Sequence, residues 1–153
     1  YNRFLNSYIP NKMELIKTGK ILDEENNVVG QHNGNTNYTV GQRKGIGLSY
    51  PDPRYVKSID AKTNTIIISK KNNLYKKTCY VSNINWLIDE PDLPIEVLSQ
   101  IRYNSKKVES IILFENNKIK VQFIDPQLAV TPGQSIVFYI NDILIGGGII
   151  ELL

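Results

Sequence analysis

The clearest potential for chemistry lies in one glycine-rich stretch, Tyr38–Leu48, which reads YTVGQRKGIGL. Gln42, Arg43 and Lys44 stand between glycines in this stretch. Glycine lets the backbone adopt a positive φ and lets a ligand approach the main chain closely. Arginine presents a planar fork of N–H donors that suits phosphates and base edges. The pattern is typical of a loop that binds a polyanion, but a glycine-rich hairpin with solvated charges fits it equally well.

Two further stretches combine residue types that can hold RNA. Arg102 and Tyr103 lie in the run Ile101–Lys107 at the end of a predicted strand. An arginine beside a tyrosine offers a phosphate clamp and a stacking face, which is the combination that single-stranded nucleotides use. Thr131–Gln134 is predicted to be a rigid turn that presents the Gln134 amide, a group able to donate and accept. Each stretch also has a structural interpretation, because strand-end tyrosines often pack and Pro-Gly pairs often only turn the chain.

Nucleophilic and metal chemistry has less support from the residues. The chain has a single cysteine, Cys79, and a single histidine, His32, so neither an intrachain disulfide nor a Cys/His metal cluster can form within it. We expect Cys79 to be a small buried residue and His32 to be structural, with a Cys79 nucleophile as an alternative. The sequence contains no Walker-type phosphate loop, dinucleotide fingerprint or convincing carboxylate pair. The residues alone therefore favour a binding module over a catalyst.

Composition indicates a soluble globular chain of one or two domains. Of the 153 residues, 41% are hydrophobic and 22% are charged, and the formal net charge is +3. The positive excess falls before residue 94, and a mild excess of this kind permits a nucleic-acid partner without requiring one. No apolar run approaches the roughly 20 residues that span a bilayer. We therefore expect a cytoplasmic (alternatively organellar) monomer with no membrane association.

The predicted fold is mainly β. Apolar spacing over residues 1–9 predicts a short N-terminal helix, and residues 1–18 are interpreted as a helical lead-in. Hairpins predicted around Asn26-Asn27 and over residues 55–69 make residues 19–90 a β-rich central domain. A polar stretch with two prolines, residues 89–94, is interpreted as the domain boundary. Short strands then follow over residues 94–153 and suggest a small closed barrel, because closure removes exposed sheet edges. The strands of this barrel are expected at 95–103, 108–114, 118–123, 135–140 and 143–150.

Taken together, these stretches resemble the C-terminal part of the tRNA-specific 2-thiouridylases, the bacterial and organellar MnmA/TrmU family. The resemblance covers essentially the whole chain, and its most specific match is Tyr38–Gly47. Other matching runs, in the family order, are Gly19-Lys20-Ile21, Asn85-Trp86-Leu87, Ile101-Arg102-Tyr103, Ala129–Gln134 and Gly146–Ile150.

The resemblance implies a role in a known reaction. Members of the family use ATP, with Mg, to adenylate the C2 oxygen of the wobble uridine in tRNA, and a cysteine persulfide then delivers sulfur. In the family, the ATP site and both catalytic cysteines precede the segment that matches this chain. The resemblance therefore implies no catalytic residue, cofactor or metal ligand here, and a sulfur-donor protein as a partner of the full-length enzyme.

By motif, the tRNA contacts of the family fall on Arg102, Tyr103 and Gln134. Gln42, Arg43 and Lys44 are secondary candidates, either for tRNA contact or for shaping a loop beside the active site. A function from another class also stays open: a non-catalytic β-barrel adaptor that binds a protein partner. The weak net charge and the acidic balance after residue 93 favour that alternative.

Overall fold

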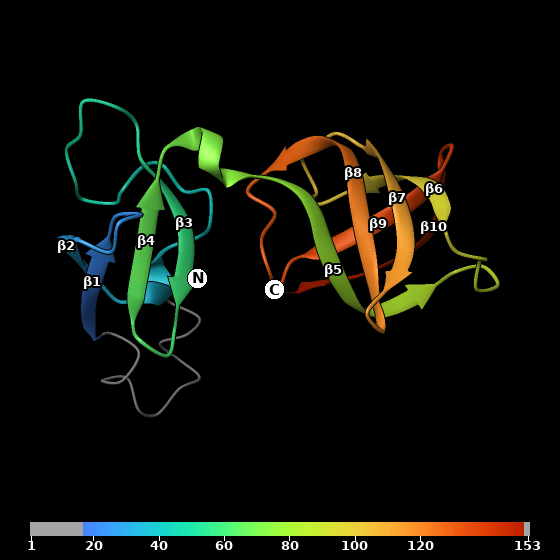
Figure 1. Cartoon of the computed structure of the whole chain (residues 1–153), viewed down its shortest axis with the longest axis horizontal. Coiled ribbons are helices and arrows are strands. Elements are labelled where there is room, and N and C mark those ends of the chain that lie inside the picture. The colour runs from blue at the N-terminus through green and yellow to red at the C-terminus, as the bar shows by residue number, and fades with distance from the viewer. Residues whose placement is uncertain (1–16, 152–153) are drawn as a thin grey trace. The chain divides into compact units, whose positions relative to one another are not determined.

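The computed structural model describes residues 17–151 of the chain. The chain divides into two compact units between Leu74 and Tyr75, and both are built from β-strands (Figure 1). The N-terminal helix predicted at residues 1–9 lies outside the described residues. Within residues 17–151 the helical segments are two short 3-10 helices, η1 (Asn35–Asn37) and η2 (Lys71–Leu74). The prediction of a mainly β fold is confirmed.

The first unit holds a four-stranded mixed sheet in the order β2-β1-β4-β3. β1 (Thr18–Leu22) pairs antiparallel with β2 (Val28–Asn33), and β3 (Tyr55–Asp60) pairs antiparallel with β4 (Thr65–Ser69), so both predicted hairpins are confirmed. The parallel pairing of β1 with β4 joins the two hairpins. In the first turn Asn26 has a φ of 64°, a conformation that asparagine tolerates better than most residues.

The glycine-rich stretch is a loop anchored in the core of this unit, not a hairpin. Ile46 is buried together with Ile21, Val56 and other sheet residues, and Leu48 packs against the same cluster. Gly30 on β2 provides the space for this packing, because a Cβ there would lie 2.6 Å from Cδ2 of Leu48. The apolar positions of the loop thus point inward and fix its backbone against the sheet.

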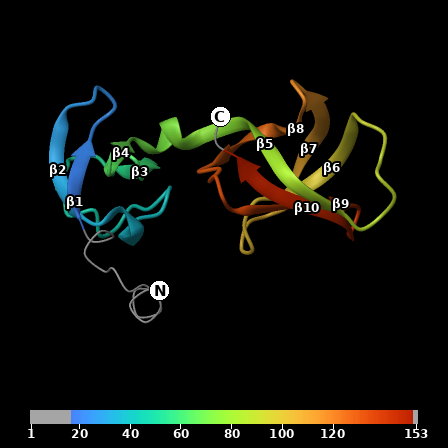
Figure 2. The same ribbon diagram turned by 90° about the horizontal axis from the view of Figure 1, so that it is seen from below.

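The second unit is a closed six-stranded barrel in the order β10-β5-β8-β7-β6-β9, with antiparallel pairing throughout (Figures 1 and 2). Its interior is mainly apolar, with Phe123, Phe138 and Ile112 fully buried, and it also holds the hydrogen-bonded pair Ser99 and Ser110. The strands are β5 (Tyr75–Trp86), β6 (Ile95–Gln100), β7 (Val108–Glu115), β8 (Lys118–Leu128), β9 (Ser135–Ile140) and β10 (Ile143–Glu151).

The barrel starts earlier in the sequence than the composition suggested. β5 pairs with both β8 and β10 and so closes the barrel, whereas the sequence analysis placed this strand in the central domain, 19–90. The proline-containing stretch 89–94 connects β5 to β6, which are two strands of the same barrel. Polar, proline-rich segments occur both as loops within a domain and as linkers between domains. The composition of this stretch therefore did not distinguish a barrel loop from a domain boundary.

Consecutive glycines in β10 let it lie close to its neighbours. A Cβ on Gly146 would lie 2.7 Å from the Asn85 carbonyl oxygen, and one on Gly148 would lie 2.6 Å from Cγ1 of Val81, both on β5. A Cβ on Gly147 would lie 2.7 Å from the carbonyl oxygen of Ile136 on β9. These glycines therefore let β10 approach both β5 and β9 closely enough to close the barrel.

Candidate nucleic-acid interface

The barrel brings Arg102 and Gln134 into direct contact, although 32 positions separate them in the sequence. Nε of Arg102 donates to Oε1 of Gln134 at 3.2 Å. Nη2 of the same guanidinium donates to the carbonyl oxygen of Ala129 at 2.8 Å and to Oγ1 of Thr131 at 3.1 Å. Arg102 thus braces the loop that carries Gln134, a role that the residue types alone did not reveal.

The backbone of the loop before β9 is fixed independently of that brace. Ala129 has a φ of 52° and Gly133 a φ of 82°, values that turn the chain sharply and that favour glycine. The N–H of Gly133 donates to the carbonyl oxygen of Ile150 at 2.8 Å, and the N–H of Ile150 donates back to the carbonyl oxygen of Gln134 at 2.9 Å. The predicted rigid turn is therefore tied to β10 on one side and to Arg102 on the other.

Hydrogen bonding leaves one side of the Gln134 amide available. A guanidinium has donors and no acceptor, so the amide oxygen must be the atom that faces Arg102. The amide nitrogen then points elsewhere, and its two N–H groups make no hydrogen bond to another described residue. Gln134 can therefore donate to an acceptor outside the chain, such as a base carbonyl or a phosphate oxygen.

Tyr103 projects from the loop between β6 and β7 and is 95% exposed. The loop itself is well held: Nε2 of Gln100 donates to the carbonyl oxygens of Tyr103 at 3.0 Å and Ser105 at 2.7 Å, and Oγ of Ser105 donates to the carbonyl oxygen of Arg102 at 2.8 Å. Sequence reasoning missed Gln100, which positions the exposed ring. Because the loop backbone is held in place and the ring is exposed, the ring is suited to stacking on a base.

In the first unit, Gln42 shapes the glycine-rich loop from within. Its Oε1 accepts from the N–H of Thr39 at 3.0 Å, and its Nε2 donates to the carbonyl oxygen of Lys44 at 2.9 Å. The carbonyl oxygen of Gln42 also accepts from the N–H of Val56 on β3 at 2.9 Å. Both ends of the amide are engaged, whereas the side chains of Arg43 and Lys44 are exposed. The loop therefore presents the two cations and uses the glutamine as an internal support.

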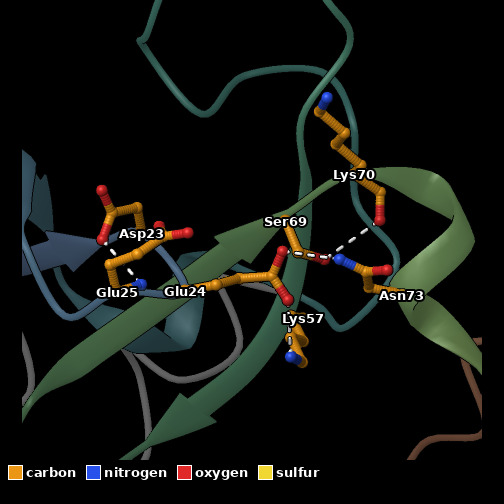
Figure 3. A network of polar contacts seen from close by, with 7 residues as sticks. All are labelled: Asp23, Glu24, Glu25, Lys57, Ser69, Lys70 and Asn73. Atoms are coloured by element: carbon orange, nitrogen blue, oxygen red, sulfur yellow. Dashed lines mark hydrogen bonds and ion pairs between the residues drawn. The ribbon is translucent and has the colours of Figure 1, made fainter.

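A polar network ties the rest of this unit together (Figure 3). Glu24, in the turn after β1, accepts from Nζ of Lys57 on β3 at 2.7 Å and from Nδ2 of Asn73 on η2 at 2.6 Å. The hydrogen bond from Lys57 is the main cause that lowers the pKa of the Glu24 carboxyl, with Asn73 adding to it against the opposing effect of burial. The network holds the edge of the sheet next to the glycine-rich loop.

Comparison with known proteins places the chain in a family. Residues 2–70 match a model described as the tRNA methyl transferase PRC-barrel domain, and residues 76–150 match one described as the aminomethyltransferase β-barrel domain. The tRNA-specific 2-thiouridylase MnmA of Acetivibrio thermocellus is 42% identical over 153 residues, which are 99% of this chain and 42% of the relative. The MnmA of Rippkaea orientalis is 44% identical over 151 residues, which are 97% of this chain and, again, 42% of the relative.

The chain belongs to the MnmA family. It corresponds to the C-terminal portion, with the PRC-barrel and β-barrel domains, and it spans about 42% of the length of these relatives. The two matched ranges coincide closely with the two compact units of the structure.

The lone cysteine of this MnmA portion, Cys79, lies in the core of the barrel. Cys79 is buried, and burial raises the pKa of its thiol to about 12, with a smaller opposing effect from Lys76. Burial and the raised pKa both disfavour the reactive thiolate, so they weigh against Cys79 as a nucleophile. No group of three His, Cys, Asp or Glu residues gathers between residues 17 and 151.

His32 is held by contacts inside the first unit. It is almost fully buried, its ring lies edge-on to Tyr38 with 5.6 Å between centroids, and its Nε2 lies 3.1 Å from the carbonyl oxygen of Asn64. No helix in the described part of the chain is long and apolar enough to cross a membrane.

One hollow on the barrel differs in chemical character from the RNA candidates. It is a groove of about 500 Å³ on the outer wall, with apolar residues such as Leu98 and Ile111 and two carboxylates, Glu96 and Glu109. Glu96 lies opposite Ile111 and Leu98 lies opposite Glu109 in the pairing of β6 with β7. Two carboxylates beside the groove would repel a polyanion, so we do not assign RNA to this surface.

Proposed function

We propose that this chain is the tRNA-binding portion of a tRNA 2-thiouridylase. In this proposal the full-length enzyme installs sulfur at C2 of the wobble uridine, using ATP and a cysteine persulfide bound outside this chain. It acts as a monomer in the cytoplasm and receives sulfur from a donor protein. Family membership supports the reaction class, and the barrel loops support a role in holding tRNA.

The observation that carries the proposal is the arrangement of Tyr103 beside the Arg102–Gln134 pair. The ring is 95% exposed on a loop whose backbone is held by Gln100, and the neighbouring amide of Gln134 keeps its N–H groups for an outside acceptor. Stacking and amide donation together suit an unpaired nucleotide. The guanidinium adds a positive charge that favours the phosphate beside it.

The test is tRNA binding by the purified chain at two salt concentrations. We expect affinity that falls with salt, because neutralised phosphates release counterions. Tyr103→Ala should weaken binding by about 1–3 kcal/mol, the usual contribution of one stacked base, while the salt dependence stays nearly unchanged. Phe114→Ala is the matched control, since Phe114 is an exposed aromatic residue in β7, away from these loops. Equal losses in both variants would count against a specific role for Tyr103.

A second candidate function is a protein adaptor, and the acidic groove favours it. Its apolar residues with Glu96 and Glu109 suit a protein segment that carries basic and apolar side chains. The same titration separates the two functions. Negligible tRNA binding that does not respond to salt would favour the adaptor, whereas salt-sensitive binding that depends on Tyr103 would favour the tRNA role.

A further inference from the structure

The glycine-rich loop of the first unit forms one side of a small polar pocket. The pocket has a volume of about 170 Å³ and is lined by the loop itself, by Tyr50 and by the residues just before β3. Arg43, near the middle of the connection between β2 and β3, and Arg54, at its end, both line it. Two guanidinium-bearing residues around one small hollow mark it as a candidate site for an anion.

The loop backbone offers further donors to this pocket. Gly45 and Gly47 have φ values of 75° and 79° on either side of Ile46, whose side chain is buried in the core. The backbone N–H groups of these three residues donate to no other described residue. Successive N–H groups in such turns form concave anion sites. Packing does not explain glycine at position 47, because a Cβ there would meet no atom within 4 Å.

Arg54 supplies an independent indication. Its Nε is buried and has no hydrogen-bond partner among the described residues, and its guanidinium carbon lies 4.9 Å from the centre of the Tyr50 ring. A buried donor without an acceptor is unfavourable. An anion held in the pocket would offer acceptors to the guanidinium of Arg54 and would leave its contact with the Tyr50 ring in place.

The surrounding carboxylates do not cancel this positive charge. Asp52 also lines the pocket, but its Oδ2 lies 3.7 Å from Nζ of Lys70. The charge of Arg54 also acts on Asp23 and Glu24, and each of these carboxylates already accepts a hydrogen bond from another side chain. The pocket itself therefore keeps two arginines against one carboxylate that has its own cation.

We propose that this pocket binds a phosphate group, and that the phosphate belongs to the backbone of the tRNA. The second part rests on the proposed function. A volume of about 170 Å³ is enough for a phosphate, but it is well below the roughly 300–1,000 Å³ of pockets that enclose whole small-molecule ligands. The chain would then hold tRNA at two places, one in each unit, with Arg54 and the loop N–H groups forming the second.

The first experiment measures tRNA affinity of the whole chain against salt for Arg43→Gln, Arg54→Gln and the double variant. Loss of this one phosphate contact in the double variant should reduce the slope of log K against log salt by about 0.9 and weaken binding about tenfold at low salt. Lys62→Gln is the control, because it removes the same charge from an exposed turn of the same unit. Arg54→Lys should restore the charge but not the bidentate geometry, and so recover only part of the affinity.

The second experiment follows the backbone amides of Gly45 and Gly47 by NMR during titration with inorganic phosphate, with sodium chloride at matched ionic strength as the reference. We expect saturable shifts with phosphate that are lost in Arg54→Gln. Arg43→Gln repeats the test at an exposed side chain, whose replacement should not disturb folding. The loss of the amide shifts can therefore be judged even if the Arg54 variant folds poorly.

The outcomes separate the two proposals. If wild-type chain binds tRNA and the arginine variants behave like Lys62→Gln, the pocket is refuted and the tRNA role stands. If wild-type chain fails to bind tRNA but the glycine amides shift with phosphate, the proposed function and the tRNA assignment fail together, while the phosphate pocket stands. Absence of both the arginine effects and the amide shifts overturns the inference completely.

Discussion

Replacing Arg102 with alanine should destabilise the barrel as well as weaken RNA binding. The guanidinium donates to Gln134 at 3.2 Å, to Ala129 at 2.8 Å and to Thr131 at 3.1 Å. A hydrogen bond contributes about 0.5–1.5 kcal/mol net. The carbonyl oxygen of Ala129 keeps the hydroxyl of Thr131 as a donor at 2.8 Å, so its loss is the smallest of the three. We therefore expect a decrease of about 2 kcal/mol in the free energy of unfolding of the barrel.

Thermal denaturation followed by circular dichroism measures this decrease directly. For a unit the size of Tyr75–Leu153, a loss of 2 kcal/mol corresponds to a fall of about 10 °C in Tm. Arg102→Lys should lose most of the same stability, because an ammonium cannot reach three acceptors in the geometry of the planar fork. Tyr103→Ala is the control: its ring is 95% exposed, so Tm should not change. An Arg102→Ala variant with unchanged Tm but reduced tRNA affinity would refute the brace and leave Arg102 as an RNA contact only.

Three further results are expected from single residues. Cys79 should resist iodoacetamide at neutral pH in the folded chain and react on unfolding, because burial raises the pKa of its thiol to about 12; rapid labelling of the native chain would contradict this. The hydrogen bond from Lys57 lowers the pKa of Glu24 in the folded chain. The ionised Glu24 therefore contributes to the free energy of unfolding above the unfolded pKa near 4.5, and this contribution is lost as pH falls through the lower folded pKa. Glu24→Gln should therefore flatten the acid side of the stability profile, by under about 1 kcal/mol because the pair is partly exposed, and an unchanged profile would remove that role. Gln134→Glu should keep or raise Tm by strengthening the contact with Arg102, yet weaken tRNA binding in filter assays because the N–H donors are gone; unchanged affinity would show that these donors do not bind tRNA.

Local patterns predicted most strand positions in this chain. The hairpin over residues 55–69 and the strands at 108–114, 135–140 and 143–150 all lie within a residue or two of the predicted positions. Turn chemistry explains this success, because asparagine tolerates positive φ and marks the reversals. Asn116 and Asn117, with φ of 53° and 59°, form the two-residue turn between β7 and β8.

Closure of the barrel could not be predicted in the same way. β5 belongs to the second unit because it pairs with β8 and β10, and both partners lie more than thirty residues further along the chain. Asp125-Pro126 is a dipeptide typical of loops, yet it lies inside β8. The pairing of β5 with β8 is irregular there, because the register jumps from Lys76↔Gln127 to Thr78↔Gln122. Proline is tolerated at such a bulge because no ladder hydrogen bond is required there.

The candidate site shows the same division between local and tertiary information. Sequence reasoning selected two glutamines for their amides, and the fold gives them different roles. Both ends of the Gln42 amide are bonded within its own loop, whereas Gln134 gives only its oxygen to Arg102 and keeps its N–H groups. Residue type identifies what a side chain can donate, but the fold decides which donors remain for a ligand. Arg54 illustrates the converse, because its flanking sequence gave no reason to single it out and only its buried, unpartnered Nε marks it as a candidate.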